Sequence, residues 1–387
     1  MTPVDSTQVS PQAAPGGSPK NASKPARGIK RIGVLTSGGD CPGLNSILRA
    51  VTLRAHNGYG WDVVGIEEGT RGLMARPVKA RQLKPGEETK RLLRLGGTVL
   101  GTINKGDPFA FPQADGSVVD RSSEVIEGFE TLGLDALIGI GGDGSMKILS
   151  RLATMGAIPF IGIPKTIDND VAFTEFAVGF PTAVATCVDA LDRLQPTAAS
   201  HHRVMILEVM GRDAGHLALH AGIAGGADVI LIPEIPFRMD VVAEKVKGLK
   251  EQGLNHGLIV VSEAIHLEGG DGGRQAYADG EVRYGGVGHK LGDALARATG
   301  AEVRVTVLGH VQRGGIPGSR DRVLASAFGV HAVDLLAKGQ TNRMVAWANR
   351  NVIDVTLDDV VATENRVDPK DALIKTAKGL GICLGDA

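Results

Sequence analysis

Short apolar runs, each followed directly by glycines or charged residues, constrain most strongly how this chain can fold. The runs are rich in β-branched residues and do not alternate with polar ones: Arg31–Thr36, Ala136–Ile140, Pro159–Ile163, Val204–Val209, Val229–Ile232, Leu258–Val261 and Val303–Leu308. Such runs are typical of strands in a parallel sheet that is buried on both faces. Amphipathic segments such as Leu44–Ala55, Met146–Met155 and Val241–Gln252 lie between them. The alternation predicts βαβ units and a doubly wound α/β sheet.

Polar clusters follow directly after most of these runs, where the predicted strands end. The clusters read TSGGD, GGDGS, PKTIDND, MGRDAGH, SEA and GHVQRGG. In an open parallel sheet the ligand crevice lies beyond the carboxyl ends of the strands. We therefore expect these clusters to converge on one site, although they are far apart in the sequence.

Length and composition limit the partners and the location. The chain has 387 residues, of which 43% are hydrophobic and 22% charged, which allows two soluble α/β domains. A net charge of −1 and 4% aromatic residues argue against nucleic acid or an anionic membrane as a partner. No apolar run approaches the roughly 20 residues that span a bilayer. Three scattered cysteines favour a reducing, cytoplasmic location, and residues 1–29, rich in Pro, Ser, Ala and Gly, are expected to form a disordered tail.

The segment Ile140–Ser145 combines glycines with a carboxylate directly after a predicted strand. Gly139–Gly144 satisfies the G-x-G-x-x-G dinucleotide pattern formally, but the charge of Asp143 would repel a pyrophosphate. A carboxylate among glycines suits Mg²⁺, often through water, while backbone N–H groups approach a polyphosphate. The alternative is a glycine-rich turn capped by Asp143. Because the chain contains no Gly-Lys pair, a Walker A loop is excluded.

The segment Thr36–Asn45 (TSGGDCPGLN) precedes a predicted helix. Its Gly38-Gly39 pair can bring backbone donors to an anion at the N-terminus of that helix. A turn that needs glycine, followed by a helix cap, has the same composition, so the segment alone is compatible with either interpretation.

Two carboxylates follow another predicted strand in Pro164–Asp170 (PKTIDND). In an extended chain Asp168 and Asp170 face the same way and could line one pocket. Neighbouring carboxylates raise each other's proton affinity, which suits a general base. A solvated turn of Asp and Asn residues is the alternative.

Positive side chains accompany the later strands: Arg203 and Arg212 flank one, Arg304 begins another, and His310 and Arg313 follow it. Arginines in loops at strand ends suit bidentate binding of phosphate. Singly, each arginine is more typical of a surface ion pair, and a lone His310 of a structural role. Around one rim of a nearly neutral protein they indicate an anion site. With the glycine turns and the carboxylates, the set describes phosphoryl transfer between two phosphorylated ligands.

Together these motifs resemble the phosphofructokinase family. TSGGDCPGLN, GGDGS, PKTIDND, EVMGRDAGH, the Glu263 segment and RVTVLGHVQRGG occur in that family's order and spacing, from about Arg31 to about Leu336. The resemblance implies an α/β fold of two similar three-layer lobes with mainly parallel sheets, an active site between them, and a homotetramer. It implies a nucleotide-binding lobe of residues 30–179 and 312–362, and a sugar-phosphate-binding lobe of residues 180–311 and 363–387.

The resemblance also implies roles in a transfer from Mg·ATP to the 1-hydroxyl of fructose 6-phosphate. Asp168 looks like the general base that takes the hydroxyl proton, with Asp170 beside it setting its charge and the metal environment. Thr166 would contact the sugar or the transferring phosphoryl group. Arg212 would stabilise the charge that develops on that group.

Binding residues follow from matching positions in the same motifs. The sugar phosphate would be held by Thr166, Asp168, Met210, Gly211, Arg212, Glu263, His310 and Arg313. Arg203 and Arg304 match arginines that reach the 6-phosphate from a neighbouring subunit. The nucleotide would contact Gly39, Asn104, Lys105, Gly142, Asp143, Gly144 and Ser145. Of these, Asp143 would bind Mg²⁺.

Two positions bear on the phosphoryl donor. Pyrophosphate enzymes of the family usually carry Asp where this chain has Gly144, and Lys where it has Lys165. An Asp side chain would occupy and repel the space of the α-phosphate of ATP, whereas Gly144 leaves that space open. Lys165 resembles the pyrophosphate pattern, yet a flexible lysine suits either donor. ATP is therefore predicted, with a pyrophosphate-dependent fructose 6-phosphate 1-phosphotransferase as the alternative.

Other interpretations account for fewer of the motifs. An NAD or lipid kinase shares the GGDG turn but predicts neither TIDND nor the GHVQRGG arginine. A catalytically inactive sensor would be favoured by loss of Asp168 or Arg212, and both are present. At the family's effector site only Arg49 matches, and the next arginine corresponds to Leu53, which argues against allosteric control by nucleotides or phosphoenolpyruvate.

Overall fold

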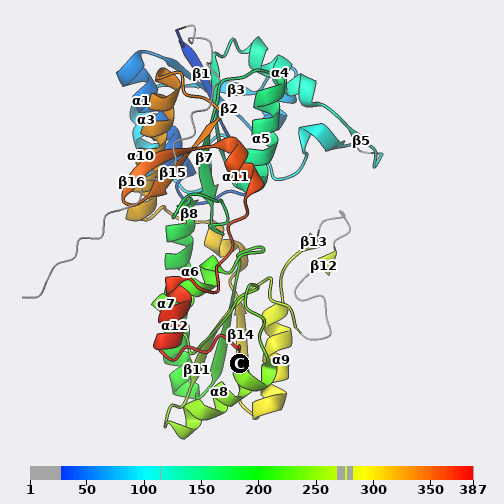
Figure 1. Cartoon of the computed structure of the whole chain (residues 1–387), viewed down its shortest axis with the longest axis vertical. Helices are drawn as coiled ribbons and strands as arrows, with labels where there is room; N and C mark the ends of the chain where they lie inside the picture. The colour runs from blue at the N-terminus through cyan, green and yellow to red at the C-terminus, as the bar shows by residue number, and fades with distance from the viewer. Residues whose placement is uncertain (1–27, 114, 268–274, 277–281, 387) are drawn as a thin grey trace, which may run out of the picture.

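The chain folds into two α/β lobes that lie one above the other in Figure 1. The computed structural model describes residues 28–113, 115–267, 275–276 and 282–386. Residues 1–27 of the predicted tail lie outside this part of the chain. Within it, no helix is both long and apolar enough to cross a membrane.

The upper lobe is built on an eight-stranded sheet in the order β16-β15-β7-β6-β1-β2-β3, with β8 paired to β7. Its strands are β1 (Arg31–Thr36), β2 (Asp62–Ile66), β3 (Ala80–Leu83), β6 (Ala136–Gly141), β7 (Phe160–Thr166), β8 (Val178–Gly179), β15 (Arg343–Ala348) and β16 (Asn351–Thr356). The central strands β15, β7, β6, β1 and β2 are parallel. The antiparallel pairs β2–β3 and β15–β16 form the two edges.

Helices cover both faces of this sheet. The helical elements of the lobe are α1 (Leu44–Tyr59), α2 (Thr70–Met74), α3 (Glu87–Arg91), η1 (Leu92–Arg94), η2 (Pro108–Ala110), α4 (Ser122–Thr131), α5 (Asp143–Met155), α10 (Ser319–Ala337) and α11 (Leu357–Ala362). On one face Ile32 and Val34 are buried with Phe328 of α10, and on the other Leu35 is buried with Leu149 of α5. Successive residues of a strand point to opposite faces, so burial of both faces explains the unbroken apolar runs.

The lower lobe repeats this three-layer plan around a smaller sheet, with the order β10-β11-β9-β14 and all strands parallel. Its elements are α6 (Phe180–His201), β9 (Val204–Val209), α7 (His216–Ala224), β10 (Val229–Leu231), α8 (Met239–Glu251), β11 (Gly257–Ser262), α9 (Val287–Thr299), β14 (Val303–Val307), η3 (Gly309–Arg313) and α12 (Ala372–Gly379). Two short hairpins lie outside the main sheets: β4 (Phe111–Pro112) with β5 (Val118–Val119), and β12 (Gln275–Ala276) with β13 (Val282–Arg283).

The predicted α/β architecture is confirmed. Each apolar run forms a strand, and each amphipathic segment lies in a helix, although α1 continues to Tyr59 and α5 begins three residues earlier, at Asp143. Sequence reasoning missed β2, β3, β15 and β16, which lie toward the edges of the upper sheet.

A buried carboxylate anchors the passage from the upper lobe to the lower one. The long helix α6 begins beside β8 and runs into the lower lobe (Figure 1). Asp321 of α10 accepts hydrogen bonds from the backbone N–H groups of Gly179 at 2.8 Å and Thr182 at 2.9 Å. It therefore satisfies first-turn amides of α6 that have no acceptor within the helix.

Candidate active site

Loops from both lobes meet at the carboxyl ends of their strands. Arg313, which ends η3 after β14, donates from Nη1 to the Asp40 carbonyl oxygen at 3.2 Å. A side chain at Gly39 would bring its Cβ within 2.6 Å of the same nitrogen, so Arg313 lies directly against the turn after β1. The charges of Arg313 and Arg212 also act on Asp168 in the upper lobe. Both lobes thus contribute to one site.

Asp168, the predicted base, is buried, with 7% of its surface exposed. Its backbone N–H donates to Thr166 Oγ1 at 3.0 Å. Among the described residues its buried Oδ1 has no hydrogen-bond partner, so an acceptor is left available. Burial, reinforced by the charge of Asp170, raises the pKa of Asp168 to about 6, against the opposing charges of Arg313 and Arg212. Such a pKa is close to the value that suits a general base near neutral pH.

The base loop, residues 166–170, does not have the extended form that the sequence suggested. Asn169 has a φ of 55°, in the left-handed region, so Asp168 and Asp170 are not related by strand geometry, and that expectation was wrong. The Asn169 side chain holds the turn: Oδ1 accepts from Ala177 N–H at 2.9 Å, and Nδ2 donates to the Glu175 carbonyl oxygen at 3.1 Å. The predicted effect on the base is nevertheless present, because the charge of Asp170 raises the pKa of Asp168.

Lys165, near the end of β7, is buried against the glycine turn after β1, with 3% of its surface exposed. Its ammonium group donates to the Gly39 carbonyl oxygen, and a Cβ at Gly38 would lie 3.3 Å from Nζ. Burial lowers the pKa of Lys165, and the charges of Asp168 and Asp170 are among those that oppose the shift. The lysine therefore lies inside the site and not on its rim.

The turn after β1 differs in part from its predicted role. Gly38, with a φ of 80°, donates its N–H to the Ile103 carbonyl oxygen at 2.9 Å, so this amide is not available to an anion. Helix α1 begins only at Leu44, and the turn is therefore not its N-terminus. Any anion contact of this turn must come from Gly39 or from groups around it.

The GGDGS segment forms the start of α5. Gly142 precedes the helix, and Asp143, Gly144 and Ser145 make its first turn. The first amides of a helix have no intrahelical acceptor and carry the positive end of its dipole, so this turn can bind a phosphate. Asp143 pairs with Lys147 at 2.9 Å and keeps 25% of its side chain exposed. Apart from its chain neighbours and the backbone of its own helix, no described residue has an atom within 4 Å of the Cβ position of Gly144, so a side chain there would extend into open space.

The arginine loop, residues 210–215, follows β9 in a strained turn. Gly211 has a φ of 147° and Arg212 a φ of 51°, and Ala214 N–H donates to the Gly211 carbonyl oxygen at 3.0 Å. The Arg212 side chain is 70% exposed, and its Nε lies 3.9 Å from Asp213 Oδ2. The turn thus exposes the guanidinium while its backbone is fixed.

Glu263, at the end of β11, supports this loop from the side. Its Oε1 accepts the Arg212 backbone N–H at 3.1 Å. Burial raises the pKa of Glu263 to about 7, with smaller contributions in the same direction from the charges of Asp168 and Glu208. The sugar-binding carboxyl predicted from the sequence and the predicted base therefore lie close enough to influence each other.

Gln312 is a site residue that sequence reasoning missed. Its buried side chain accepts from Met210 N–H at 3.2 Å and donates to the Gly309 carbonyl oxygen at 2.9 Å. It therefore joins the arginine loop to η3, where His310 is exposed and Arg313 turns into the site. The sequence could have indicated this role, because Gln312 lies between His310 and Arg313 in the GHVQRGG motif.

Arg203 and Arg304 are not on the rim with the other positive groups, so the expectation of one cluster within the chain was wrong. Arg203 precedes β9, and Arg304 is the second residue of β14, whereas the site lies where those strands end. Both pair with Glu302, at 2.8 Å and 2.5 Å. A strand of six residues separates its two ends by roughly 17–20 Å.

Asn104 and Lys105 lie on an exposed bend near the turn after β1. Thr102, two residues before this bend, donates from Oγ1 to the Gly38 carbonyl oxygen at 2.6 Å. The bend is thereby tied to the same turn as Lys165, as a donor-phosphate role would require.

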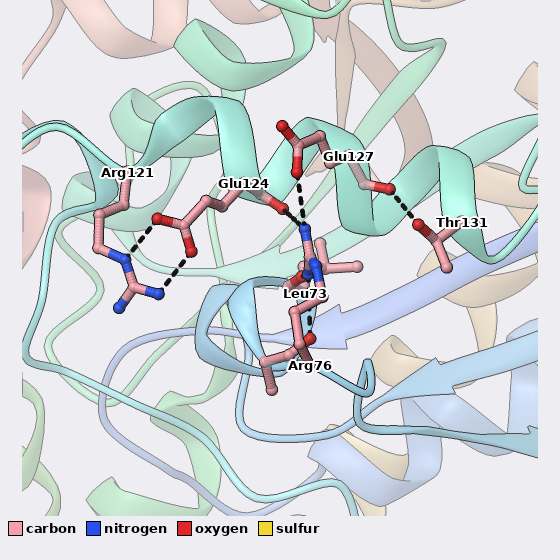
Figure 2. Close-up of polar contacts among 7 residues, drawn as sticks. Leu73, Arg76, Arg121, Glu124, Glu127 and Thr131 are labelled. Carbon is pink, nitrogen blue, oxygen red and sulfur yellow. Dashed lines mark hydrogen bonds and ion pairs between the residues drawn. The ribbon is translucent and has the colours of Figure 1, made fainter.

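A cavity of about 480 Å³ lies beyond the carboxyl end of β2, lined by Glu68, Arg71, Met74, Ala75, Lys79, Phe111 and Arg121. The residue after Glu68 of this lining is Gly69, where a Cβ would lie 3.0 Å from the Thr36 carbonyl oxygen at the end of β1. Figure 2 shows the contact between α2 and α4 beside it, where Arg121 forms two hydrogen bonds with Glu124. Sequence reasoning missed this cavity because its lining comes from short segments with no clear periodicity.

Comparison with known proteins identifies the class to which this two-lobed α/β fold belongs. The family model described as phosphofructokinase matches residues 31–336, well over half of the chain. The chain therefore belongs to the phosphofructokinase family, as its motifs predicted.

Named relatives make the likeness more particular. ATP-dependent 6-phosphofructokinase 1 of Synechocystis sp. is 57% identical over 358 residues, covering 92% of this chain and 99% of that protein. ATP-dependent 6-phosphofructokinase 1 of Nostoc sp. is 58% identical over 357 residues, with the same coverage.

Solved structures agree on the fold. Phosphofructokinase from Saccharomyces cerevisiae is 27% identical, with a TM-score of 0.72 and coverage of 91% of this chain. This chain spans only 46% of that yeast chain. A pyrophosphate-dependent phosphofructokinase from Marinobacter aquaeolei covers 93% of both chains with a TM-score of 0.74, but at 24% identity it shows the fold alone.

Proposed function

We propose that this protein is an ATP-dependent 6-phosphofructokinase, which transfers the γ-phosphoryl group of Mg·ATP to the 1-hydroxyl of fructose 6-phosphate. One observation carries the proposal. A buried carboxylate, Asp168, has an unsatisfied oxygen and a pKa raised to about 6, and charges from both lobes act on it. A base at the contact of a phosphate-binding lobe and an arginine-bearing lobe suits transfer of a phosphoryl group to a hydroxyl.

The proposed reaction divides its tasks between the two loops. Asp168 accepts the proton of the 1-hydroxyl as that oxygen forms a bond to the γ-phosphorus, and the bond to the leaving ADP oxygen breaks. Arg212, whose side chain is exposed on a backbone bonded to Glu263, stabilises the negative charge that spreads over the transferring oxygens. Thr166, whose Oγ1 accepts the Asp168 backbone N–H within the base loop, is the side chain we assign to the sugar or the phosphoryl group.

The donor phosphates would lie between the first turn of α5 and Gly39, within reach of Lys165 and the bend at Asn104 and Lys105. Residues 30–179 and 312–362 would form this nucleotide-binding lobe, and 180–311 and 363–387 the sugar-phosphate-binding lobe. The α5 turn supplies backbone donors, and the buried ammonium supplies charge.

Mg²⁺ fits this donor set. In the described part of the chain, no group of three or more His, Cys, Asp or Glu side chains could hold a metal ion unaided. Mg²⁺ is usually bound through one or two carboxylates together with substrate phosphates and water, and Asp143 offers a partly exposed carboxylate in the phosphate turn. Buried oxygens of Asp168 and Asp170 without described partners lie on the facing loop. The ion would neutralise charge on the donor phosphates.

The choice of ATP over pyrophosphate rests on two features of the upper lobe. Gly144 leaves open space beside the phosphate turn, where an Asp would add a charge. The cavity beyond β2 is within the roughly 300–1,000 Å³ of small-molecule sites and could take the nucleoside, a part that pyrophosphate lacks. Lys165, which resembles the pyrophosphate pattern, is already bonded to the Gly39 carbonyl oxygen and suits either donor.

The sugar phosphate would bind against Met210, Gly211, Glu263, His310 and Arg313 in the lower lobe. Arg203 and Arg304 lie at the far end of their strands, so we propose that they complete the site of a neighbouring subunit in a homotetramer. Exposed apolar residues on η3, α10 and the segments beside them offer a surface for that contact: Val307, Val311, Ile316 and Val323. A cytoplasmic location, supported by three free cysteines, completes the proposal.

A test compares ATP and pyrophosphate as donors in the formation of fructose 1,6-bisphosphate with Mg²⁺. We expect turnover with ATP, and Gly144→Asp should lower kcat/KM for ATP about 100-fold, because like charges brought together cost several kcal/mol. Gly248→Asp is the matched control, since it adds the same charge at a helical glycine with equally open described surroundings. Turnover with pyrophosphate alone would overturn the ATP assignment, and equal losses with both donors would exclude Gly144 as the discriminating position.

A further inference from the structure

A short segment of the C-terminal region lies against the base loop. The interlobe strap, residues 363–371, connects α11 of the upper lobe with α12 of the lower lobe. Glu364 forms an isolated antiparallel bridge with Val171, directly after the base loop. Asn365 Nδ2 donates to the carbonyl oxygen of Asn169 at 2.7 Å. The strap therefore holds the one residue of the base loop whose backbone is left-handed.

The same strap is linked through Glu234 to the end of the arginine loop. Val367 N–H donates to Glu234 Oε1 at 2.9 Å, and Gly215 N–H donates to the same oxygen at 2.9 Å. A Cβ at Gly215 would come within 2.6 Å of Glu234 Oε2, so the carboxylate lies tightly against this glycine.

These contacts form a chain from one catalytic loop to the other. It runs from Asn169 through Asn365 and Val367 to Glu234 and Gly215. Residues with left-handed backbone conformations cost free energy and persist only where surrounding contacts determine them. The strap provides such a contact directly to Asn169 of the base loop, and through Glu234 it is linked to Gly215 at the end of the arginine loop.

We propose that Asn365 and Glu234 are positioning residues that set the separation between the base Asp168 and the charge-stabilising Arg212. The inference rests on the proposed function, which gives those two side chains their roles. Phosphoryl transfer depends on the relative position of base, acceptor and stabilising charge, and misplacement by about 1 Å through a distant change can cost about 100-fold in rate. Neither Asn365 nor Glu234 needs to touch a substrate for this effect.

The structure offers a matched pair of variants at Asn365. Asn365→Ala removes the bond to the base loop, whereas Asn255→Ala removes a similar bond, to the Ala199 carbonyl oxygen at 3.0 Å, elsewhere in the lower lobe. We expect Asn365→Ala to lower kcat about 10- to 100-fold, with KM for both substrates within about threefold and Tm shifted no more than in Asn255→Ala. Asn255→Ala should keep its kcat. A purely structural strap would instead shift Tm and leave kcat unchanged.

A second pair acts at the other end of the strap. Glu234→Gln keeps an oxygen that can accept both N–H groups and should retain kcat, whereas Glu234→Leu removes both bonds and should lose it. If the Glu234→Leu protein does not fold, the comparison of Asn365→Ala with Asn255→Ala still tests whether the strap affects kcat. Combined with Asp168→Asn, Asn365→Ala should cause no further loss of kcat, because it acts through the base.

The outcomes separate the two proposals. Wild-type turnover together with an Asn365→Ala variant of unchanged kcat would overturn the strap inference and leave the proposed function intact. A wild-type chain that does not phosphorylate fructose 6-phosphate would overturn both. A further loss of kcat in the double variant would show that the strap acts independently of Asp168.

Discussion

The base loop and the arginine loop, to which we assign catalysis, hold their key side chains in opposite ways. In the base loop Asp168 is 7% exposed and Lys165 beside it 3% exposed. In the arginine loop the Arg212 side chain is 70% exposed, although its backbone is bonded to Glu263. Each loop contains a left-handed residue, Asn169 in one and Arg212 in the other, so the difference lies in the environment of the side chains and not in the kind of turn.

This difference matches the chemistry that each loop would perform. A carboxylate with the usual pKa is a weak base, and burial is the main means by which a protein raises that pKa. A guanidinium is charged at every accessible pH, so burial would add cost without improving its function. An exposed arginine can instead move onto charge that appears only when the phosphoryl group transfers. In this site burial therefore serves to raise the pKa of the base, and exposure leaves the arginine free to meet the developing charge.

The largest expected effect comes from the buried side. Asp168→Asn keeps the shape of the side chain but cannot accept a proton, so kcat should fall by about 10²–10⁴, the usual contribution of a general base. KM for fructose 6-phosphate should change little, because the binding groups remain. Steady-state kinetics at saturating substrates would measure both. A loss of kcat smaller than tenfold would show that the base is elsewhere.

The exposed side should give a somewhat smaller effect. Arg212→Ala removes charge stabilisation and should lower kcat by about 10²–10³. Arg212→Lys should recover only part of this loss, because a lysine is a point charge without the planar fork of donors. Arg193→Ala, which removes another exposed arginine with an i,i+4 partner on α6, is the control and should retain activity. Full activity in Arg212→Lys would mean that charge alone is needed.

The pH profile should show the effect of burial directly. Because burial raises the pKa of Asp168 to about 6 and that of Glu263 to about 7, kcat/KM should fall as pH decreases through these values. Each protonation that abolishes activity lowers the rate tenfold per pH unit below its pKa. Glu263→Gln should remove the upper inflection and leave the lower one. A profile flat down to pH 5 would contradict the raised pKa of Asp168.

The sequence predicted the framework well because buried parallel strands produce unmistakable apolar runs. The same logic located Asp143 and Asp168, because carboxylates directly after such strands lie at the ligand-binding edge of the sheet. The errors for Arg203 and Arg304 have a clear cause. The sequence already placed Arg203 before one strand and Arg304 near the start of another, but nearness to a strand was counted as nearness to the site, and the two ends of a strand lie on opposite sides of the lobe.

Other features depended on contacts that no local pattern reports. The left-handed turn at Asn169 is fixed by Ala177 and Glu175, and by Asn365 from nearly two hundred residues further along the chain. The burial of Lys165 follows from the packing of two loops against each other. A pattern in sequence can thus predict which groups gather, but not which of them are desolvated, and desolvation sets their proton affinity.

The smallest predicted effect concerns stability, and it separates the two loops most clearly. Folding raises the pKa of Asp168 from its ordinary 3.8 to about 6, so the folded state binds this proton more tightly than the unfolded state. The free energy of unfolding should therefore decrease as pH rises through this interval, and the charged carboxylate should cost about 3 kcal/mol above it. Asp168→Asn removes that cost, while Arg212→Ala, at an exposed position, should change stability by no more than about 0.5 kcal/mol.

Thermal unfolding at pH 8 and pH 4 would measure this difference. The Asp168→Asn protein should melt at a higher temperature than the wild type at pH 8, and the gap should close by pH 4, where the wild-type carboxyl is already neutral. Arg212→Ala should follow the wild type at both pH values. An Asp168→Asn protein less stable than the wild type at pH 8 would contradict this prediction. It would mean that neighbouring groups stabilise the charged carboxylate by more than burial destabilises it. The two loops would then differ only in the exposure of their side chains.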